Sequence, residues 1–239
     1  LGVSTLYKNT TGLRNTAVGG NALSENTTGN YNTASGMYAL QANTTASYNT
    51  AFGNEALLSN TTGANNTASG SYALKLNTTG TNNTAVGYLA LKTNTAGAAN
   101  TSIGAHALQY NTTASKNIAV GTHAMRYTTT GAENTASGYM ALYTNTTGSG
   151  NASYGAYSLY DNISGAENSA LGSYALTDNT TGCQNAAVGR QALQLNTTGS
   201  HNSAVGKSAL EANTTGCQNS AFGRAALKSN TTAGNNTAV

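Results

Sequence analysis

Hydrophobic and polar positions along this chain repeat with a period of 17 residues. The unit reads N-T-T-G-x-x-N-T-A-x-G-x-x-A-L-x-x, and fourteen units fill residues 1–238 without an insertion or deletion. We call a set of residues that are 17 apart a column. One Asn column, from Asn15 to Asn236, and one Gly column, from Gly2 to Gly223, never vary. A fixed internal period of this length indicates a repeat architecture in which each unit stacks on the next.

The pattern within one unit favours β-structure over helix. Each unit carries Gly and most carry an N-T-T run, all weak helix formers, and the apolar positions trace no helical stripe. If each unit forms one coil of a solenoid, neighbouring coils pair as parallel strands about 4.8 Å apart. The sequence therefore predicts an all-β parallel β-solenoid, or β-roll, of fourteen 17-residue coils. We expect one strand near residues 15–18, a second near 21–24, and corners at 19–20 and 26–29.

The invariant columns suit backbone corners. Glycine adopts positive φ and permits close backbone approach. Asparagine tolerates the left-handed region, bonds its local backbone and can stack in ladders. The predicted structural corner residues are Gly19, Gly36, Gly53, Asn15, Asn32 and Asn49. The N-T-T run also matches the acceptor pattern for N-glycosylation, but a structural role for this corner is the favoured interpretation. The candidate glycosylation sites are Asn9, Asn26, Asn43 and Asn60.

The unbroken period predicts one repeat array over residues 1–239. Leu1 begins in mid-pattern, so we expect a fragment of a longer repeat protein, without caps. The column that contains Leu1, Val18, Ser35 and Phe52 mixes small polar with large apolar side chains. That mixture suits a partly buried subunit interface, and we therefore expect a homotrimer or an end-to-end filament.

Composition excludes several classes of protein. Charged residues are 7% of the chain, against roughly 25% in ordinary globular domains. The net charge of +3 is too small and too dispersed for a nucleic-acid-binding face. No apolar stretch approaches the ~20 residues that span a bilayer, so we expect no membrane insertion. Disordered chains are usually rich in Pro and charge, and this chain contains no Pro.

Few residues could carry enzymatic chemistry. Glu133 and Glu167 share a column two coils apart, a spacing of about 9.6 Å, near that of inverting glycosidase carboxylates. No pocket is implied around them, and we interpret them as exposed acids. His106 and His123 share a column in adjacent coils, but two His without a third ligand make a weak metal site. We expect neither an enzyme nor a cofactor.

Other side chains could bind a partner or each other. Cys183 and Cys217 share a column two coils apart, beyond the ~7 Å limit for a disulfide, so no intrachain bridge is expected. An aromatic patch beside a basic column could bind glycans or a polyanionic surface, although the same residues would also fit outward columns that vary without a role. The candidate ligand-binding ladder consists of Tyr139, Tyr143, Tyr157, Tyr160, Arg190, Lys207 and Arg224.

The sequences N-T-A-V-G at 15–19 and 83–87 and N-S-A-V-G at 202–206 resemble the head repeats of YadA-like trimeric autotransporter adhesins. The whole unit is similar to repeats in phage tail-fibre and related bacterial surface proteins. The resemblance covers all 239 residues, although the repeat here is longer than that of the adhesin head. It implies a left-handed parallel β-roll, three chains side by side, and a function in attachment.

We therefore expect a non-enzymatic, extracellular fibre or stalk segment that serves attachment or projection, as in a phage tail fibre, a surface adhesin or a free filament. Its expected partners are copies of itself and cell-surface glycans. The alternative is an ice-binding β-solenoid that orders water on Thr columns such as those of Thr10 and Thr11. Adjacent residues of a strand point to opposite faces, which argues against that alternative.

Overall fold

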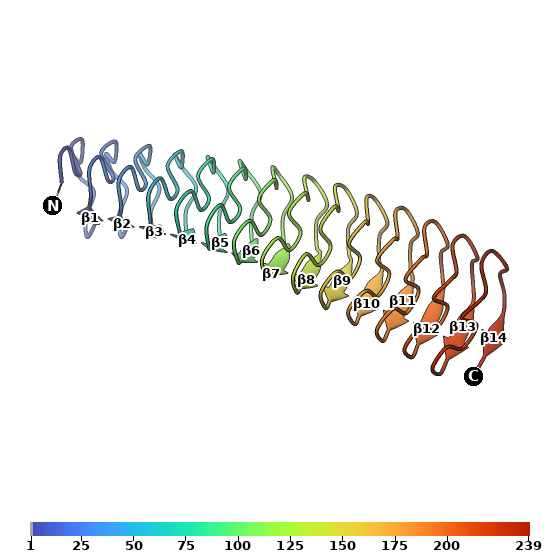
Figure 1. Ribbon diagram of the computed structural model, residues 1–239. Helices are drawn as coiled ribbons and strands as arrows, with labels where there is room; N and C mark the ends of the chain where they lie inside the picture. Colours follow the sequence, from blue (N-terminus) through green and yellow to red (C-terminus); the bar gives the residue numbers. More distant parts are fainter. Residues whose placement is uncertain (1) are drawn as a thin grey trace. The chain divides into compact units, whose positions relative to one another are not determined.

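The computed structural model describes residues 2–239, which form two compact units, one ending at Asn117 and the other spanning Ile118–Val239. Each repeat contributes one short strand, and within each unit the strands lie on the same side of successive coils (Figure 1). Unit 1 contains β1 (Thr16–Val18), β2 (Thr33–Ser35), β3 (Thr50–Phe52), β4 (Thr67–Ser69), β5 (Thr84–Val86) and β6 (Thr101–Ile103). Unit 2 contains β7 (Ile118–Val120), β8 (Thr135–Ser137), β9 (Ala152–Tyr154), β10 (Ser169–Leu171), β11 (Ala186–Val188), β12 (Ser203–Val205), β13 (Ser220–Phe222) and β14 (Thr237–Ala238).

The strands of each unit pair in parallel and in chain order. In unit 1, Thr16 pairs with Thr33, and the register continues through β6. In unit 2, the same register runs from β7 to β14. Each strand residue therefore faces its neighbour in the same column. This arrangement confirms the predicted all-β parallel solenoid with one coil per 17-residue repeat.

The second predicted strand is wrong, because residues 21–24 form turns. The amide of Ala22 donates to the carbonyl of Gly19 at 3.2 Å, and the amide of Ser24 donates to that of Asn21 at 3.4 Å. Asn21 and Leu23 have φ of 56° and 50°. A β-turn with positive φ at its third residue usually carries Gly or Asn there. The chain accommodates Leu in this conformation at the same position of successive coils, with Met125 in its place in one coil.

The turn is held by its neighbour and by burial. The amide of Leu23 donates to the carbonyl of Ala39 in the next coil at 3.0 Å. The Leu23 side chain is fully buried, as are Leu40 and Ala39 of the following coil. A bulky residue at positive φ is locally unfavourable. Burial of the side chain and the bond to the next coil offset that cost.

The interior of each coil combines apolar columns with columns of buried Asn. The Leu column and two Ala columns, represented by Leu40, Ala34 and Ala39, are buried. The column of Val18 and Phe52, expected to be partly interior, points outward from the third strand position, and these two residues are 46% and 47% exposed. The column therefore lies outside the coil interior, because alternation along the strand turns the first and third residues away from the buried second one.

Two Asn columns complete the interior. Asn43 donates through Nδ2 to Asn26 Oδ1 at 2.8 Å and to the carbonyl of Ala46 at 3.0 Å. In the invariant column, Asn32 Oδ1 accepts the backbone amide of Asn49 at 3.0 Å, and Asn49 Nδ2 donates to the carbonyl of Gly63 at 2.9 Å. Buried polar groups are costly unless they are hydrogen-bonded. The side-chain bonds therefore both satisfy the interior and tie each coil to the next.

The predicted corner residues lie at both ends of the strand. Asn15, Asn32 and Asn49 directly precede it, and Gly19, Gly36 and Gly53 directly follow it. These glycines have φ of 124°, 142° and 129°. A Cβ on Gly19 would lie 2.6 Å from the carbonyl oxygen of Gly36. Only glycine meets both the conformational and the spatial requirement at this corner.

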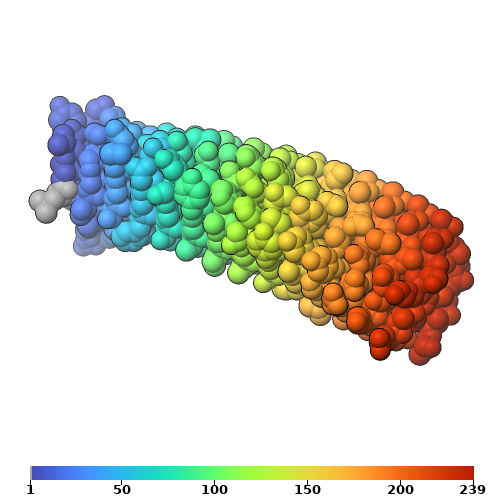
Figure 2. Space-filling view, viewed as in Figure 1, coloured from blue at the N-terminus to red at the C-terminus, as the bar shows by residue number. Residues whose placement is uncertain are grey.

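In the space-filling view, the coils of each unit appear as adjoining bands (Figure 2).

Candidate functional site

Unit 2 carries a cluster of tyrosines on its turn surface. Tyr157 and Tyr174 stack with ring centroids 5.2 Å apart, and Tyr143 and Tyr160 stack at 5.1 Å. The two stacks meet where Tyr157 lies 5.7 Å from Tyr160. The structure thus brings predicted ladder residues into direct contact. The tyrosine cluster, as named below, consists of Tyr127, Tyr139, Tyr143, Tyr157, Tyr160 and Tyr174.

Two members of the cluster stand perpendicular to the stacks. The Tyr139 ring lies 5.5 Å from Tyr157 at an interplanar angle of 80°, and Tyr127 lies 5.1 Å from Tyr143 at 88°. Stacking covers the ring faces that meet within a column. Tyr139 and Tyr127 are 44% and 38% exposed, which leaves them as the rings most accessible to a ligand.

Packing within the cluster raises the pKa of two of its tyrosines, Tyr157 and Tyr127. Desolvation, the neighbouring Tyr139 and Tyr174, and a hydrogen bond with Tyr139 together raise the pKa of Tyr157. A hydrogen bond with Tyr143 is the main cause that raises the pKa of Tyr127. The cluster is therefore an uncharged aromatic surface whose hydroxyls can form hydrogen bonds.

The predicted basic residues lie farther along unit 2. Arg190, Lys207 and Arg224 are exposed and occupy one column in consecutive coils. In the described part of unit 2, no ring contact or ion pair joins these three to the tyrosine cluster. Ionised Glu211 accepts a hydrogen bond from Ser208, which is the main cause that lowers its pKa, and nearby lysines lower it further. The aromatic and basic parts of the predicted ladder therefore follow one another along unit 2, with Arg190 in the coil after Tyr174, and within the described residues they make no ring contact with each other.

The other chemically interesting residues do not assemble into a centre. Glu133 and Glu167 are both exposed on unit 2, where Gln184 Nε2 donates to Glu167 at 2.9 Å. His106 belongs to unit 1 and His123 to unit 2. Throughout residues 2–239, no three His, Cys, Asp or Glu side chains gather closely enough to hold a metal ion.

The two cysteines act as hydrogen-bonding groups in an outward column. Both are free thiols. Cys183 Sγ accepts the backbone amide of Ala166 at 3.4 Å, and Cys217 Sγ accepts that of Ser200 at 3.4 Å. Ser200 Oγ accepts the amide of Cys183 at 3.0 Å in the same way. The thiols thus take a place in the ladder that serine fills elsewhere.

The asparagines of the candidate glycosylation sites use their side chains inside the coil. Asn26, Asn43 and Asn60 are fully buried, and their Nδ2 atoms donate to neighbouring side chains and carbonyls. Asn9 is half-buried and donates to the carbonyl of Gly12. A glycan on Nδ2 would replace one of these donated hydrogens. The geometry therefore argues against glycosylation of the folded coils and supports the structural interpretation of the N-T-T corner.

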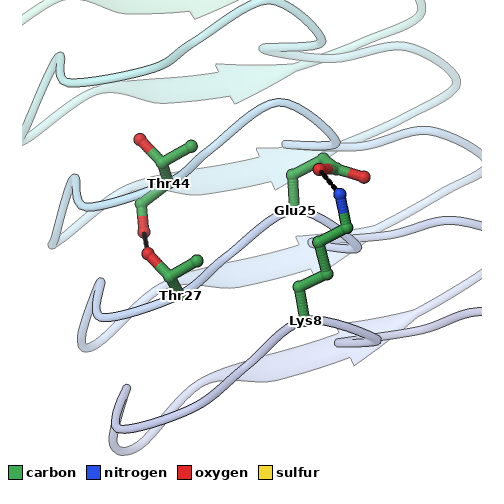
Figure 3. Close-up of polar contacts among 4 residues, drawn as sticks. All are labelled: Lys8, Glu25, Thr27 and Thr44. Carbon is green, nitrogen blue, oxygen red and sulfur yellow. Dashed lines mark hydrogen bonds and ion pairs between the residues drawn. The ribbon is translucent and has the colours of Figure 1, made fainter.

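The first Thr column has its hydroxyls engaged in the coil-to-coil ladder. Thr27 Oγ1 donates to the carbonyl of Thr44 at 3.0 Å (Figure 3). The ion pair between Lys8 and Glu25, at 2.6 Å, also joins adjacent coils in this view. The second Thr column, represented by Thr28, is exposed. Of the two Thr columns of the N-T-T run, the second is therefore the one that presents its side chains to water.

The strands of unit 2 present a furrowed apolar surface, whose large residues belong to the column of Val18 and Phe52 that the sequence suggested for a subunit interface. We define the outer sheet face as the first and third residues of β9–β13. The first residues are small: Ala152, Ser169, Ala186, Ser203 and Ser220. The third residues are large and exposed: Tyr154, Leu171, Val188, Val205 and Phe222. An open cavity of 370 Å³ lies on this face, lined by Ala152, Tyr154, Ser169, Ala170, Leu171 and Val188.

Comparison with known proteins adds no relative. The chain matches no protein-family model, and no curated protein or solved structure is significantly similar to it. Residues 2–239 also contain no helix long and apolar enough to cross a membrane. The function must therefore be argued from the coil itself.

Proposed function

We propose that this chain is an extracellular structural segment of a fibre or stalk that serves attachment or projection and assembles with copies of itself as a trimer or filament. One observation carries the proposal, namely the division of roles among the columns of each coil. The Asn, Gly, Ala and Leu columns are occupied by ladders, corners and core, while the outward columns vary. Such a coil can be repeated while its surface changes.

The resemblance of the repeats to adhesin heads and phage tail-fibre proteins supports an extracellular location and a role in attachment. The tyrosine cluster is the proposed attachment surface, and cell-surface glycans are the proposed ligand. Aromatic rings can stack on the apolar faces of sugars, and the neutral hydroxyls can hydrogen-bond to sugar hydroxyls. The exposed column of Arg190, Lys207 and Arg224 adds a salt-sensitive attraction to acidic surface polymers.

A glycan-array and cell-binding assay tests this proposal. The test variant carries Tyr143→Ser, Tyr157→Ser, Tyr160→Ser and Arg190→Ser. Because aromatic residues and Arg dominate binding hot spots, we expect its affinity to fall by at least about tenfold.

The matched control removes the stacked pair of unit 1, in which Tyr31 and Tyr48 lie 4.9 Å apart. A Tyr31→Ser, Tyr48→Ser variant should retain the affinity of the wild type. Equal binding by the test variant and the wild type would contradict the assigned attachment surface and leave the segment a spacer.

Ice binding is the second candidate, and the exposed Thr28 column is the observation in its favour. The hydroxyls of the Thr27 column already donate to backbone carbonyls, which leaves one of the two Thr columns of the N-T-T run with its hydroxyls free of that ladder. We therefore expect thermal hysteresis no larger than that of an unrelated protein at equal concentration. A clear hysteresis gap, lost when Thr28 and its column neighbours are replaced by Val, would favour ice binding over the fibre proposal.

A further inference from the structure

We infer that the outer sheet face of unit 2 binds the same face of a second copy of this chain, with large side chains of one copy seated in the small-residue furrow of the other. This inference rests on the self-association in the proposed function, and it replaces the trimer with a twofold pair that can recur side by side along a filament.

The furrow and the ridge run side by side along the coils. In β10, small Ser169 and large Leu171 lie on the same face, two residues apart, and β12 repeats this contrast with Ser203 and Val205. Residues two apart on a strand project from the same face. The contrast recurs in every coil from β9 to β13, so the furrow is continuous. Its 370 Å³ cavity shows that the furrow has room for side chains from outside.

A twofold axis parallel to the stacking direction makes this face complementary to itself. The axis reverses the strand direction of the partner but keeps its coils at the same height. The third residue of each strand then lies opposite the first residue of the partner's equivalent strand. Leu171 enters the furrow at Ser169 of the partner subunit, and the reverse contact follows by symmetry. A twofold interface uses the same patch on both subunits, as this geometry requires.

The chemistry of the face suits an apolar partner. The outer sheet face contains no charged residue, so pairing buries no unpaired ion. Its large side chains are 38–53% exposed. An aromatic side chain has an area of about 200 Å² and Leu and Val have less, so about half of one large side chain and part of its small neighbour expose roughly 100 Å² per coil. Over the five coils β9–β13, the face supplies roughly 500 Å² per partner, or about 1,000 Å² in total, which reaches the lower size limit of specific protein–protein interfaces.

Unit 1 lacks the same furrow. Its first strand residues are all Thr, from Thr16 to Thr101, and its third residues include Ser35 and Ser69 among larger ones. A branched Thr fills the space that Ala or Ser leaves open in unit 2. The argument for pairing is therefore specific to unit 2.

Disulfide trapping in the full chain tests the geometry. In a background with Cys183→Ser and Cys217→Ser, the variants Ser203→Cys and Val205→Cys are prepared separately, one with an affinity tag. In the proposed pairing, position 203 lies opposite position 205 of the partner. Mixing the two should give at least about fivefold more disulfide-linked dimer than either protein alone.

Charge insertion tests the energetics by analytical ultracentrifugation. The variant Leu171→Glu, Val205→Glu places like charges in the paired face and should raise the dimer dissociation constant at least about tenfold. The matched control Thr198→Glu, Thr215→Glu adds the same charge at exposed positions away from this face and should assemble as the wild type does. Circular dichroism of both variants checks that the fold is retained.

The outcomes separate this inference from the proposed function. Mixed-disulfide trapping together with selective loss of assembly in the Leu171→Glu, Val205→Glu variant supports the pairing. If the wild type assembles and this variant assembles equally well, the inference is overturned while the fibre proposal stands. A wild type that remains monomeric at about 100 μM, well above typical specific affinities, overturns the pairing and the proposed self-association, but not the glycan attachment, which has its own assay.

Discussion

Thr128 interrupts a buried Asn column of unit 2, and its replacement by Asn should stabilise this unit. The residue is fully buried, and its Oγ1 has no hydrogen-bond partner. In the next coil, Asn145 Nδ2 donates to the carbonyl of Gly148 at 2.9 Å, but position 128 offers it no amide oxygen. One coil further, Asn162 Nδ2 donates to both Asn145 Oδ1 at 2.8 Å and Gly165 at 2.9 Å. The substitution restores this pattern.

The expected increase in the free energy of unfolding follows from the cost of burying a polar group without a hydrogen-bond partner. A buried donor or acceptor without a partner costs about 1–3 kcal/mol. Removing the orphan hydroxyl and adding an acceptor for Asn145 should therefore raise the free energy of unfolding of unit 2 by about 1–3 kcal/mol. At this chain length, each kcal/mol corresponds to about 2–4 °C in melting temperature.

The stability gained from Thr128→Asn also depends on how Met125 packs in the same coil. Met125 is the one exception in the Leu column and lies in the same coil as Thr128, whose amide donates to its carbonyl. Met adapts to irregular space and can fill the volume that Thr leaves relative to Asn. We therefore expect the double variant Met125→Leu, Thr128→Asn to be at least as stable as the single variant.

Urea unfolding and native-state hydrogen exchange measure the effect, because solenoid stability is a sum of local terms and exchange reports on each coil. The proteins are expressed in a host without N-glycosylation, since the substitution creates a sequon. Thr130→Asn, at an exposed position nearby, is the matched control and should change stability by less than about 0.5 kcal/mol. If the single and double variants both match or fall below the wild type, the stabilising role of the Asn ladder is refuted.

Two further substitutions test the corner and the charges of unit 2. Gly121→Val should lower the free energy of unfolding by more than about 3 kcal/mol in urea unfolding. Gly121 has a φ of 132°, and a Cβ there would lie 2.5 Å from the carbonyl oxygen of Gly138. Wild-type stability of this variant would contradict the steric argument. Desolvation and the charge of Asp161 raise the pKa of Asp178 above its ordinary 3.8, so folding is favoured below that pH and weakened as pH rises through the raised value. Asp178→Asn should therefore add about 0.2–1 kcal/mol at pH 7 and nothing at about pH 3, and an equal effect at both pH values would count against this repulsion.

The sequence was informative where a residue's role follows from its column. The period alone predicted the parallel register, since a coil of constant length must place Thr16 beside Thr33. The positive φ at Gly19 was expected, because a residue without Cβ suits such a corner. The contact between Tyr157 and Tyr174 was likewise foreseeable from their shared column. All three statements depend on spacing along the chain.

The sequence was misleading where the backbone adopts a conformation that its side chain does not favour. The run Asn21, Ala22, Leu23 and Ser24 was expected to form a short strand, and nothing about Leu predicts φ of 50°. That conformation is stable only because the next coil accepts the Leu23 amide and the interior buries its side chain. Neither contribution exists in an isolated unit.

By itself, the sequence determined the coil length, the parallel register and the residues committed to corners and ladders, because translation by one period maps each residue onto a chemically matched neighbour. The tertiary structure decided which side chains face water. It turned Leu171 and its column outward and placed Asn26 in the interior. The physical reason is that orientation depends on the path of the whole coil, since a turn in place of a strand redirects the side chains that follow it.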